Sequence, residues 1–378
     1  MKYYYYLWLN RPIKNFFNTQ YKKNVLISYI VHPFRRSKDF SHTNVIEALS
    51  IAKVFKNLGY NVDIVHYSYS YKIYYNQYDI IFGFGEPLIN SFYKRERDIL
   101  TIYYGTGMHV CHQNHATLKR VKEVYQKKGV WIIESSRLVE KTWSVQTSLV
   151  DSMIVIGYGE VVNSYRKYYE GKIYPVPVTY YKIFDNPLNI IKQKNFLNGK
   201  KHFVWFGSGG AIHKGLDLLL EIFSKNNQLN LHICGPLDKE PKFQKVFFKE
   251  LYNTSNIYTY GFVDLQSNVF KKIVRDNVFV IFPSCSEGQP SSIINLMANG
   301  LIPIVHSYSG IKTKGFGVTI NDLTINCIKE AIDYAVSLGS KELKERSIKS
   351  IKYTEENHSL EKFSVKMREN LEKIIAEA

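Results

Sequence analysis

Residues 282–300 have the sequence FPSCSEGQPSSIINLMANG and continue from the apolar run Val278–Phe282. This order predicts a buried strand, a loop and a helix, with Pro290 at the first helical position and Gly300 just past the end. Glu287 then lies directly before the helix, at the carboxyl edge of a sheet. A carboxylate there can accept two sugar hydroxyls in bidentate fashion, or it can merely cap the helix, which is worth about 0.5–2 kcal/mol.

The same loop and helix offer further polar groups. Backbone N–H groups that precede a helix can meet oxygens of a sugar or a phosphate. A side chain one helical turn further along faces the same side of the helix. The predicted ligand-binding residues of this segment are Gly288, Gln289, Pro290, Ser291 and Asn295.

A second segment with the order strand, loop, helix is residues 205–217, WFGSGGAIHKGLD. Its glycines allow backbone N–H groups to approach a ligand closely, and Lys214 adds a full positive charge where a helix begins. This combination fits a diphosphate at the carboxyl edge of a sheet, although it matches neither a Walker A loop nor G-x-G-x-x-G. The alternative is a glycine-rich turn with a surface lysine. The predicted phosphate-binding residues are Gly207, Ser208, Gly209, Gly210 and Lys214.

Short apolar runs alternate with helical patterns along most of the chain, which predicts parallel sheets with helices on both faces. The predicted strands are Asn24–Val31, Asn61–His66, Asp79–Phe84, Ile99–Tyr104, Ser152–Ile156, His202–Phe206, Leu229–Cys234, Asn256–Tyr260, Val278–Phe282 and Ile302–His306. The polar stretch Thr179–Lys200 interrupts the alternation and is predicted to connect two domains. We therefore predict an α/β protein of two Rossmann-like, doubly wound domains facing a central cleft, with bounds 1–185 and 186–355. A C-terminal helix, 356–378, is predicted to pack back toward the first domain.

Together the two loops resemble the C-terminal domain of group 1 (family 4) glycosyltransferases, which have the GT-B fold. The family pattern runs strand, Gly-Arg, loop, Lys-Gly, then Ser-Glu-Gly-x-Pro and Glu-x7-Glu, followed by Ala-x-Gly-x-Pro. This chain has Lys214-Gly215, then SEGQP at 286–290 and ANGLIP at 298–303. The resemblance covers Phe203–Ser309, whereas the first half matches in architecture only.

Two positions depart from the family pattern. Ser208 stands where the family has the Arg that, with the Lys, holds the leaving diphosphate. Its neutral hydroxyl leaves more of that stabilisation to Lys214 and the glycine N–H groups. Asn295 replaces the second Glu, which contacts the nucleotide ribose in the family, and its amide can still bond a hydroxyl.

His109 follows a predicted strand of the first domain, and the resemblance suggests that it contacts the donor sugar. A neutral imidazole can hydrogen-bond a sugar hydroxyl and polarise it. Two alternatives stay open: a purely structural histidine, or a metal site with the neighbouring Cys111, His112 and His115. We predict no metal, because one helical turn seldom supplies three ligands by itself.

The loop after the first strand is basic and leads into a helix. In the resembled fold this loop closes over the donor phosphates and the acceptor. The candidate acceptor- or phosphate-binding residues are Arg35, Arg36, Thr43 and Asn44, and Lys38 adds charge. A solvated basic loop is the alternative. Glu134, Arg137 and the turn Tyr258–Asp264 are further candidates for the cleft.

The chain has 378 residues, of which 45% are hydrophobic and 22% charged. This composition is that of a globular protein and excludes a chain that is mainly disordered. Its formal net charge is +17, and residues 1–200 hold 28 Lys and Arg against 14 Asp and Glu. Such a basic half suits nucleic acid, anionic lipid or a phosphorylated ligand, or is a solvated face only. Because no helix-turn-helix, RNP motif or zinc finger is present, we predict no nucleic acid partner.

The basic first half predicts a peripheral contact with the inner face of the cell membrane, and further features predict a cytoplasmic protein. The sequence has no apolar run of about 18 residues and no secretory signal at its start. The four cysteines lie far apart, which indicates reduced thiols.

The resemblance implies a retaining, metal-independent sugar transferase with a nucleoside diphosphate sugar as donor and no other cofactor. The expected acceptor is a growing capsule, exopolysaccharide or lipopolysaccharide, as a glycan or lipid-linked glycan. The alternatives are a non-catalytic nucleotide-sugar-binding protein on the same fold and a basic nucleic-acid-binding protein. A sugar-nucleotide epimerase shares the fold, but the sequence shows no clear pair of carboxylates for its chemistry.

Overall fold

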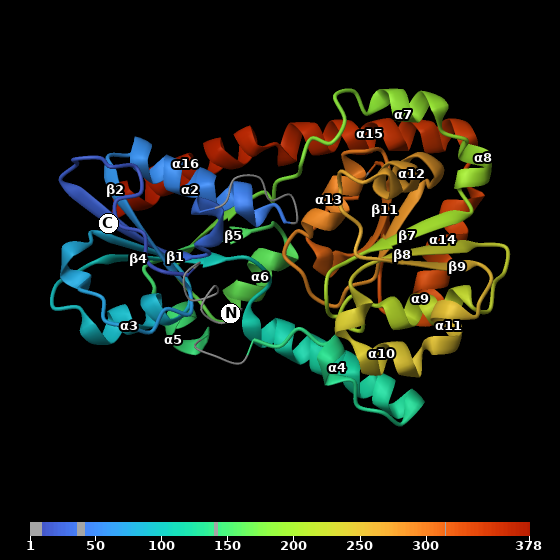
Figure 1. Ribbon diagram of the computed structural model, residues 1–378, viewed down its shortest axis with the longest axis horizontal. Helices are drawn as coiled ribbons and strands as arrows, with labels where there is room; N and C mark the ends of the chain where they lie inside the picture. The colour runs from blue at the N-terminus through green and yellow to red at the C-terminus, as the bar shows by residue number, and fades with distance from the viewer. Residues whose placement is uncertain (1–9, 36–41, 140–142, 314) are drawn as a thin grey trace. The chain divides into compact units, whose positions relative to one another are not determined.

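The computed structural model describes residues 10–35, 42–139, 143–313 and 315–378 (Figure 1). The chain forms two compact units. The first comprises the described residues of Met1–His109, Val139–Thr179 and Ser359–Ala378, and the second comprises Val110–Leu138 and Tyr180–His358. The sequence analysis assigned residues 110–138 to the first domain, whereas this stretch packs with the second unit.

The first unit contains a six-stranded parallel sheet with the strand order β2-β1-β3-β4-β5-β6. The order reverses between β1 and β3, so the sheet is doubly wound, as predicted. Its strands are β1 (Lys23–Tyr29), β2 (Tyr60–His66), β3 (Ile80–Gly83), β4 (Leu100–Gly105), β5 (Ser152–Ile156) and β6 (Lys172–Val176). All five residues of β5 and all four of β3 are buried, as expected for strands covered on both faces.

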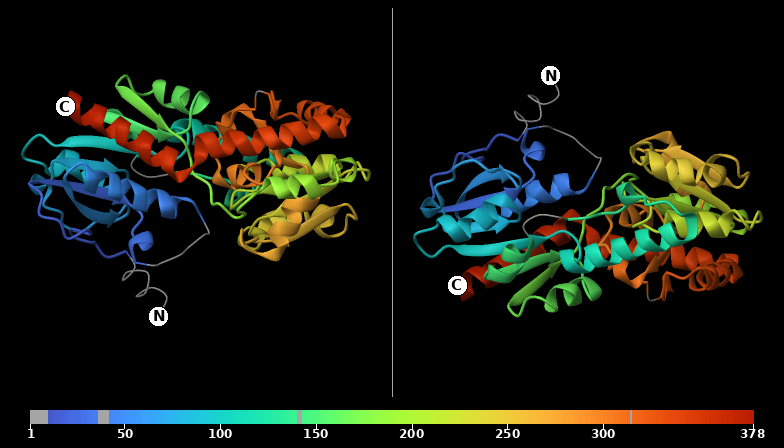
Figure 2. Two further views of the ribbon diagram at one scale, coloured as in Figure 1. Left: turned by 90° about the horizontal axis from the view of Figure 1, so that it is seen from above. Right: turned by 90° about the horizontal axis from the view of Figure 1, so that it is seen from below.

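The α-helices described in the first unit are α2 (Asn44–Asn57), α3 (Glu86–Lys94), α5 (Trp143–Leu149), α6 (Glu160–Arg166) and α16 (Leu360–Glu377). The C-terminal α16 lies along α2 and reaches β6 (Figures 1 and 2). The hydroxyls of Ser50 and Ser364 are 2.7 Å apart, and the Asn370 amide donates to the Pro175 carbonyl. Ser359 begins α16 by accepting a hydrogen bond from the Lys362 N–H.

The second unit contains another six-stranded parallel sheet, with the order β12-β11-β10-β7-β8-β9. Its strands are β7 (His202–Phe206), β8 (Asn230–Cys234), β9 (Ile257–Gly261), β10 (Phe279–Phe282), β11 (Ile302–His306) and β12 (Val318–Ile320). The strand order reverses where β7 meets β10, and the pairs Phe203–Phe279 and Val204–Val280 fix their register. Open parallel sheets bind ligands beyond the carboxyl ends of the strands at such a reversal.

Helices cover both faces of the second sheet (Figure 1). The α-helices described in the second unit are α4 (Val110–Lys128), α7 (Leu188–Gln193), α8 (Phe196–Gly199), α9 (Leu216–Phe223), α10 (Pro241–Val246), α11 (Phe248–Tyr252), α12 (Asn268–Asp276), α13 (Ser291–Met297), α14 (Ile325–Ser337) and α15 (Ser340–His358). The stretch predicted to be a connection, Thr179–Lys200, contains α7 and α8, which pack against α12 and α15. Phe247 separates α10 from α11.

Ion pairs join α4 to α9 within the second unit. The Arg120 guanidinium lies 2.5 Å from the Asp217 carboxylate on α9, and both side chains are more than nine-tenths buried. Lys127 pairs with Glu221 on the same helix, at 3.1 Å and in a more exposed position. In the described parts of the chain, no helix combines the length and hydropathy needed to cross a bilayer.

Candidate active site

Two loops of the second unit meet at the reversal of strand order. The loop at residues 207–215 follows β7, and the loop at residues 283–290 follows β10. The Cys285 N–H donates to the His213 carbonyl at 3.0 Å, and an added Cβ on Gly215 would lie 2.3 Å from the Pro283 carbonyl oxygen. Gly215 has φ +69°, a left-handed conformation that favours glycine. The two segments singled out in the sequence therefore lie in direct contact.

Lys214 and Glu287 form the centre of this site. The Lys214 ammonium lies 2.7 Å from Glu287 Oε1, and only 4% and 8% of the two side chains are exposed. The main chain holds both residues in place. The Lys214 N–H donates to the Gly210 carbonyl and its carbonyl accepts from the Trp205 indole, while the Glu287 N–H donates to the Tyr308 carbonyl.

Two further basic side chains face the Glu287 carboxylate. Nη1 of Arg137 lies 3.1 Å from Glu287 Oε2, and the Arg137 side chain is 44% exposed. His213 Nε2 lies 3.8 Å from Oε1 and donates to the Ser286 carbonyl at 2.6 Å. Burial lowers the pKa of His213 to about 3, so this imidazole is neutral near pH 7.

The charges in this cluster act on one another. Burial alone would raise the pKa of Glu287, but Lys214, Arg137 and His213 together lower it to about 2. Burial and the charge of Arg137 lower the pKa of Lys214, and Glu287 opposes that shift. One carboxylate thus faces two cations, and the cluster retains a surplus of positive charge that an anionic ligand can use.

The N–H groups of the glycine-rich loop are only partly available. The Gly207 N–H donates to the Cys234 carbonyl, and the Gly210 N–H donates to Glu240 Oε1 at 2.6 Å. The Ala211 N–H donates to the same carboxylate, at 3.0 Å from Oε2. Within the described chain the N–H groups of Ser208, Gly209 and Ile212 have no acceptor. Ile212 is fully buried, whereas Ser208 is exposed and Gly209 half-buried, so the latter two are the accessible open donors of the loop. Glu240 is a residue of this site that the sequence analysis did not identify.

The residues after Glu287 are held by the fold itself. Pro290 occupies the N-cap of α13, which begins at Ser291, whereas the sequence predicted Pro290 as the first helical residue. The Gln289 amide donates to the Gly310 carbonyl at 3.0 Å. Asn295 accepts from the Tyr181 N–H through Oδ1 and donates to the Ser291 carbonyl through Nδ2, both at 2.8 Å. A ribose hydroxyl at Asn295 would therefore compete with the main chain.

The candidates of the first unit are placed as follows. His109 is 1% exposed, its ring stacks on Tyr168, and Nε2 lies 3.2 Å from the Thr147 hydroxyl. Arg35 donates to the Arg11 carbonyl, and Thr43 is the buried N-cap residue of α2.

Asn44 is a candidate phosphate-binding residue, but its N–H already donates to His42 Nδ1 at 3.1 Å. Arg36 and Lys38 lie outside the described residues. In the described ranges, no group of three or more His, Cys, Asp or Glu is arranged to hold a metal ion.

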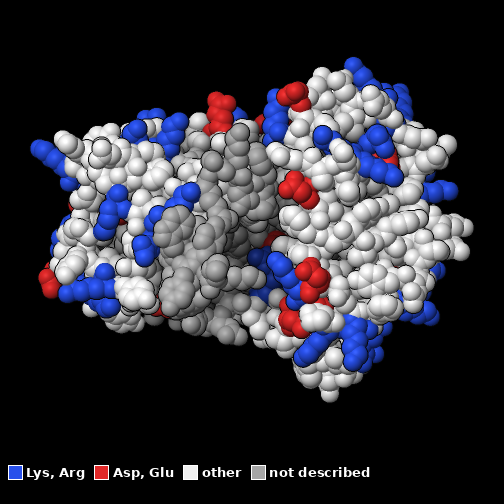
Figure 3. Space-filling view, viewed as in Figure 1, with Lys and Arg blue, Asp and Glu red and all other residues white. Residues whose placement is uncertain are grey.

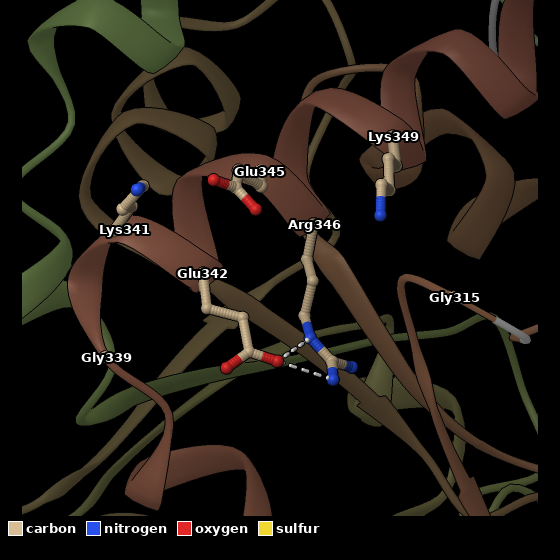
Figure 4. A pocket seen from close by; sticks show the side chains of 7 residues that line it. All are labelled: Gly315, Gly339, Lys341, Glu342, Glu345, Arg346 and Lys349. Atoms are coloured by element: carbon tan, nitrogen blue, oxygen red, sulfur yellow. Dashed lines mark hydrogen bonds and ion pairs between the residues drawn. The ribbon is translucent and has the colours of Figure 1, made fainter.

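Other candidate residues and surfaces lie outside this cluster. The Glu134 carboxylate accepts from the Lys242 N–H at the start of α10. Figure 4 shows a separate hollow of about 560 Å³ lined by Gly315, Gly339 and the first turns of α15. Three basic and two acidic side chains line it, and Arg346 pairs with Glu342 at 2.8 Å.

Comparison with known proteins relates the second unit to a protein family and the chain to a known fold. Residues 189–352 match the family model described as "Glycosyl transferases group 1". This range lies within the second unit and makes up less than half of the chain. Lys214 and Glu287 both lie inside the matched range, whereas Arg137 lies before it. A sequence comparison with curated proteins found no match.

Solved structures are similar to nearly the whole chain. Sucrose-phosphate synthase from Thermosynechococcus elongatus has 13% sequence identity and a TM-score of 0.66, with 94% of this chain and all of that chain covered. WaaG, a glycosyltransferase involved in lipopolysaccharide biosynthesis, has 12% identity and a TM-score of 0.54, with 91% and 98% covered. TarM from S. aureus, in complex with fondaparinux, alpha-GlcNAc-glycerol and UDP, has 20% identity and a TM-score of 0.50, with 76% and 54% covered. At these identities the similarity shows the fold, which is that of GT-B glycosyltransferases.

Proposed function

We propose that this protein transfers a sugar from a nucleoside diphosphate sugar to a hydroxyl of a glycan or lipid-linked acceptor. One observation carries the proposal. Lys214 and Glu287 meet at 2.7 Å beyond the carboxyl ends of β7 and β10, inside the range that matches the family model. A cation for a leaving diphosphate and a carboxylate for sugar hydroxyls are then side by side.

In the proposed reaction the bond between the anomeric carbon and the diphosphate breaks, and the diphosphate leaves with the electron pair. Lys214 and the open N–H groups of Ser208 and Gly209 stabilise that negative charge where it develops. Glu287 orients the sugar through its hydroxyls and is not a nucleophile. The acceptor hydroxyl attacks on the face from which the diphosphate departs and passes its proton to an oxygen of that diphosphate as the new glycosidic bond forms, which retains the anomeric configuration.

We propose that neither a metal ion nor another cofactor takes part. The positive charge that a metal would supply comes from side chains, because the Glu287 carboxylate already faces two cations. When a diphosphate arrives, it competes with Glu287 for these cations, and the freed carboxylate oxygens become available to the sugar.

The proposed pathway is the synthesis of a surface polysaccharide in the cytoplasm, at the inner face of the membrane. The lipopolysaccharide role of WaaG and the GlcNAc-glycerol complex of TarM support this choice by analogy. The basic first half of the sequence also supports it, and basic side chains outnumber acidic ones on the face in Figure 3. Replacing Arg35, Arg36 and Lys38 by Gln should weaken binding to vesicles with anionic lipids at low salt. Unchanged binding would contradict this location of the contact.

The donor is tested by a thermal-shift panel of UDP, GDP, ADP, CMP and their sugars. Stabilisation grows with ligand concentration over the dissociation constant, so the base of the true donor should give the largest rise in melting temperature. Absence of a shift with every nucleotide would contradict the proposal.

A non-catalytic nucleotide-sugar-binding protein is the second candidate. It is favoured by the neutral Ser208 and by the engagement of both ends of the Asn295 amide. Such a protein would show the thermal shift but would release no nucleoside diphosphate from any donor.

A further inference from the structure

Arg137 belongs to a segment with a firmly fixed main chain. This segment follows α4 and lies 150 residues before Glu287. The Arg137 N–H donates to the Thr117 hydroxyl, and its carbonyl accepts from the Gln113 amide at 2.8 Å. Two residues earlier, the Ser135 carbonyl accepts from the His213 N–H at 3.1 Å. The base of the Arg137 side chain is therefore anchored to both α4 and the loop that carries Lys214.

The stem of Arg137 crosses the glycine-rich loop. Gly210 has φ +93°, and a Cβ added there would lie 2.8 Å from Arg137 Cγ and 3.3 Å from Cδ. The absence of a side chain at Gly210 thus serves two purposes: it allows the positive φ, and it leaves the space that the arginine stem fills. This contact directs the guanidinium toward the second loop.

The two cations of the site differ in their freedom to move. The Lys214 side chain is 4% exposed, whereas that of Arg137 is 44% exposed, although both bond the same carboxylate. A half-exposed guanidinium can exchange one anion for another with little loss of solvation, whereas separating a buried ammonium from its carboxylate costs more. Arg137 presents several donors in a planar fork, which suits the paired oxygens of a phosphate.

We propose that Arg137 is a diphosphate-binding residue that exchanges partners: its guanidinium leaves Glu287 Oε2 when a diphosphate binds, which frees that oxygen for a sugar hydroxyl. This inference rests on the proposed function. It adds a second cation to the site, and this cation is free to move. It comes from a segment outside the range that matches the family model. It also supplies the positive charge that Ser208 lacks.

The test measures binding of inorganic pyrophosphate, of the tightest-binding nucleoside diphosphate among UDP, GDP and ADP, and of the corresponding nucleoside. Arg137→Gln removes the charge but keeps the stem over Gly210, and Arg137→Lys keeps the charge. Because Arg137→Gln loses a charge-assisted hydrogen bond, its affinity for pyrophosphate and for the nucleoside diphosphate should fall by about tenfold or more. Its affinity for the nucleoside should stay unchanged. Arg137→Lys should have intermediate affinity for the two diphosphates. Arg275→Gln is the matched control, because Arg275 is an exposed arginine that pairs with Asp276 on α12.

A second comparison separates binding from mere support of Glu287. In a Glu287→Gln background, Arg137→Gln should still weaken pyrophosphate binding, because the proposed contact is with the ligand itself. Two results would overturn the inference while the proposed function stands. One is that Arg137→Gln does not change pyrophosphate binding in the Glu287→Gln background. The other is that the single variant Arg137→Gln binds diphosphates as tightly as the wild type. If the wild type binds neither pyrophosphate nor any nucleoside diphosphate, both are overturned.

Discussion

The Lys214 ammonium and the Glu287 carboxylate are 2.7 Å apart, although 73 residues separate them in the chain. Both are nearly buried, so each charge depends on the other for compensation. In the absence of a ligand the site neutralises its carboxylate with its own cations. A diphosphate sugar would bring one anion for the cations and hydroxyls for the carboxylate, which replaces the internal pair with two ligand contacts.

Glu287→Gln should change how the free energy of unfolding depends on pH. The folded pKa of Glu287, about 2, lies below its ordinary value of 4.5, so the ionised carboxylate stabilises the fold above pH 4.5. This contribution, about 3 kcal/mol, is lost as the pH falls from 4.5 to 2. Urea unfolding at pH 6 and pH 3, followed through the buried Trp205, should show a smaller difference in Glu287→Gln than in the wild type. The exposed Glu356→Gln is the control, and equal differences in wild type and Glu287→Gln would refute the expectation.

Arg120→Met should destabilise the second unit by about 3–5 kcal/mol, because it leaves the buried Asp217 carboxylate without its partner. Arg120→Met with Asp217→Leu should recover much of the loss, since the uncompensated charge is then gone. Lys127→Met removes a more exposed partner of Glu221 and should cost less than about 1 kcal/mol. Urea denaturation measures all three, and equal losses for Arg120→Met and Lys127→Met would contradict the assignment.

Gly215→Ala should cost clearly more stability than Gly129→Ala. The two glycines have nearly the same backbone, φ +69° and +70°, so each substitution carries about 1 kcal/mol of strain or more. A Cβ at Gly129 meets nothing within 4 Å, whereas at Gly215 it would lie 2.3 Å from the Pro283 carbonyl oxygen. Chemical denaturation compares them, and similar losses would mean that the two loops are not in contact.

Dialysis against EDTA should leave turnover unchanged. The proposed site offsets the diphosphate charge with Lys214, Arg137 and backbone N–H groups rather than with a metal ion. Rates are compared before dialysis, after it, and after addition of Mg²⁺ or Mn²⁺. A loss of turnover that a divalent ion restores would show that the metal-independent mechanism is wrong.

Much of the fold could be predicted from the sequence, because buried parallel strands are continuous apolar runs. The bounds of β5, β7 and β11 match the prediction. Two strands were missed. β6 contains Pro175, which is tolerated because β6 is an edge strand, and β12 has only three residues.

The two central loops could also be predicted, because each couples a strand end to glycines and a charged side chain. The supporting contacts could not. The bond of Glu240 to Gly210 and the placement of Arg137 over the same glycine depend on how distant segments pack. The same holds for residues 110–138, which lie between β4 and β5 of the first unit in the sequence yet pack with the second unit.

The most direct test is the release of nucleoside diphosphate from the best donor by wild type and Lys214→Met. The variant keeps the stem of the side chain near the Phe282 ring but removes the charge. Turnover should fall by about 10²–10³-fold, as when one group that stabilises a developing anion is lost. Lys225→Met, which removes an exposed lysine, should keep the wild-type rate. A folded Lys214→Met protein that turns over at the wild-type rate would contradict the account.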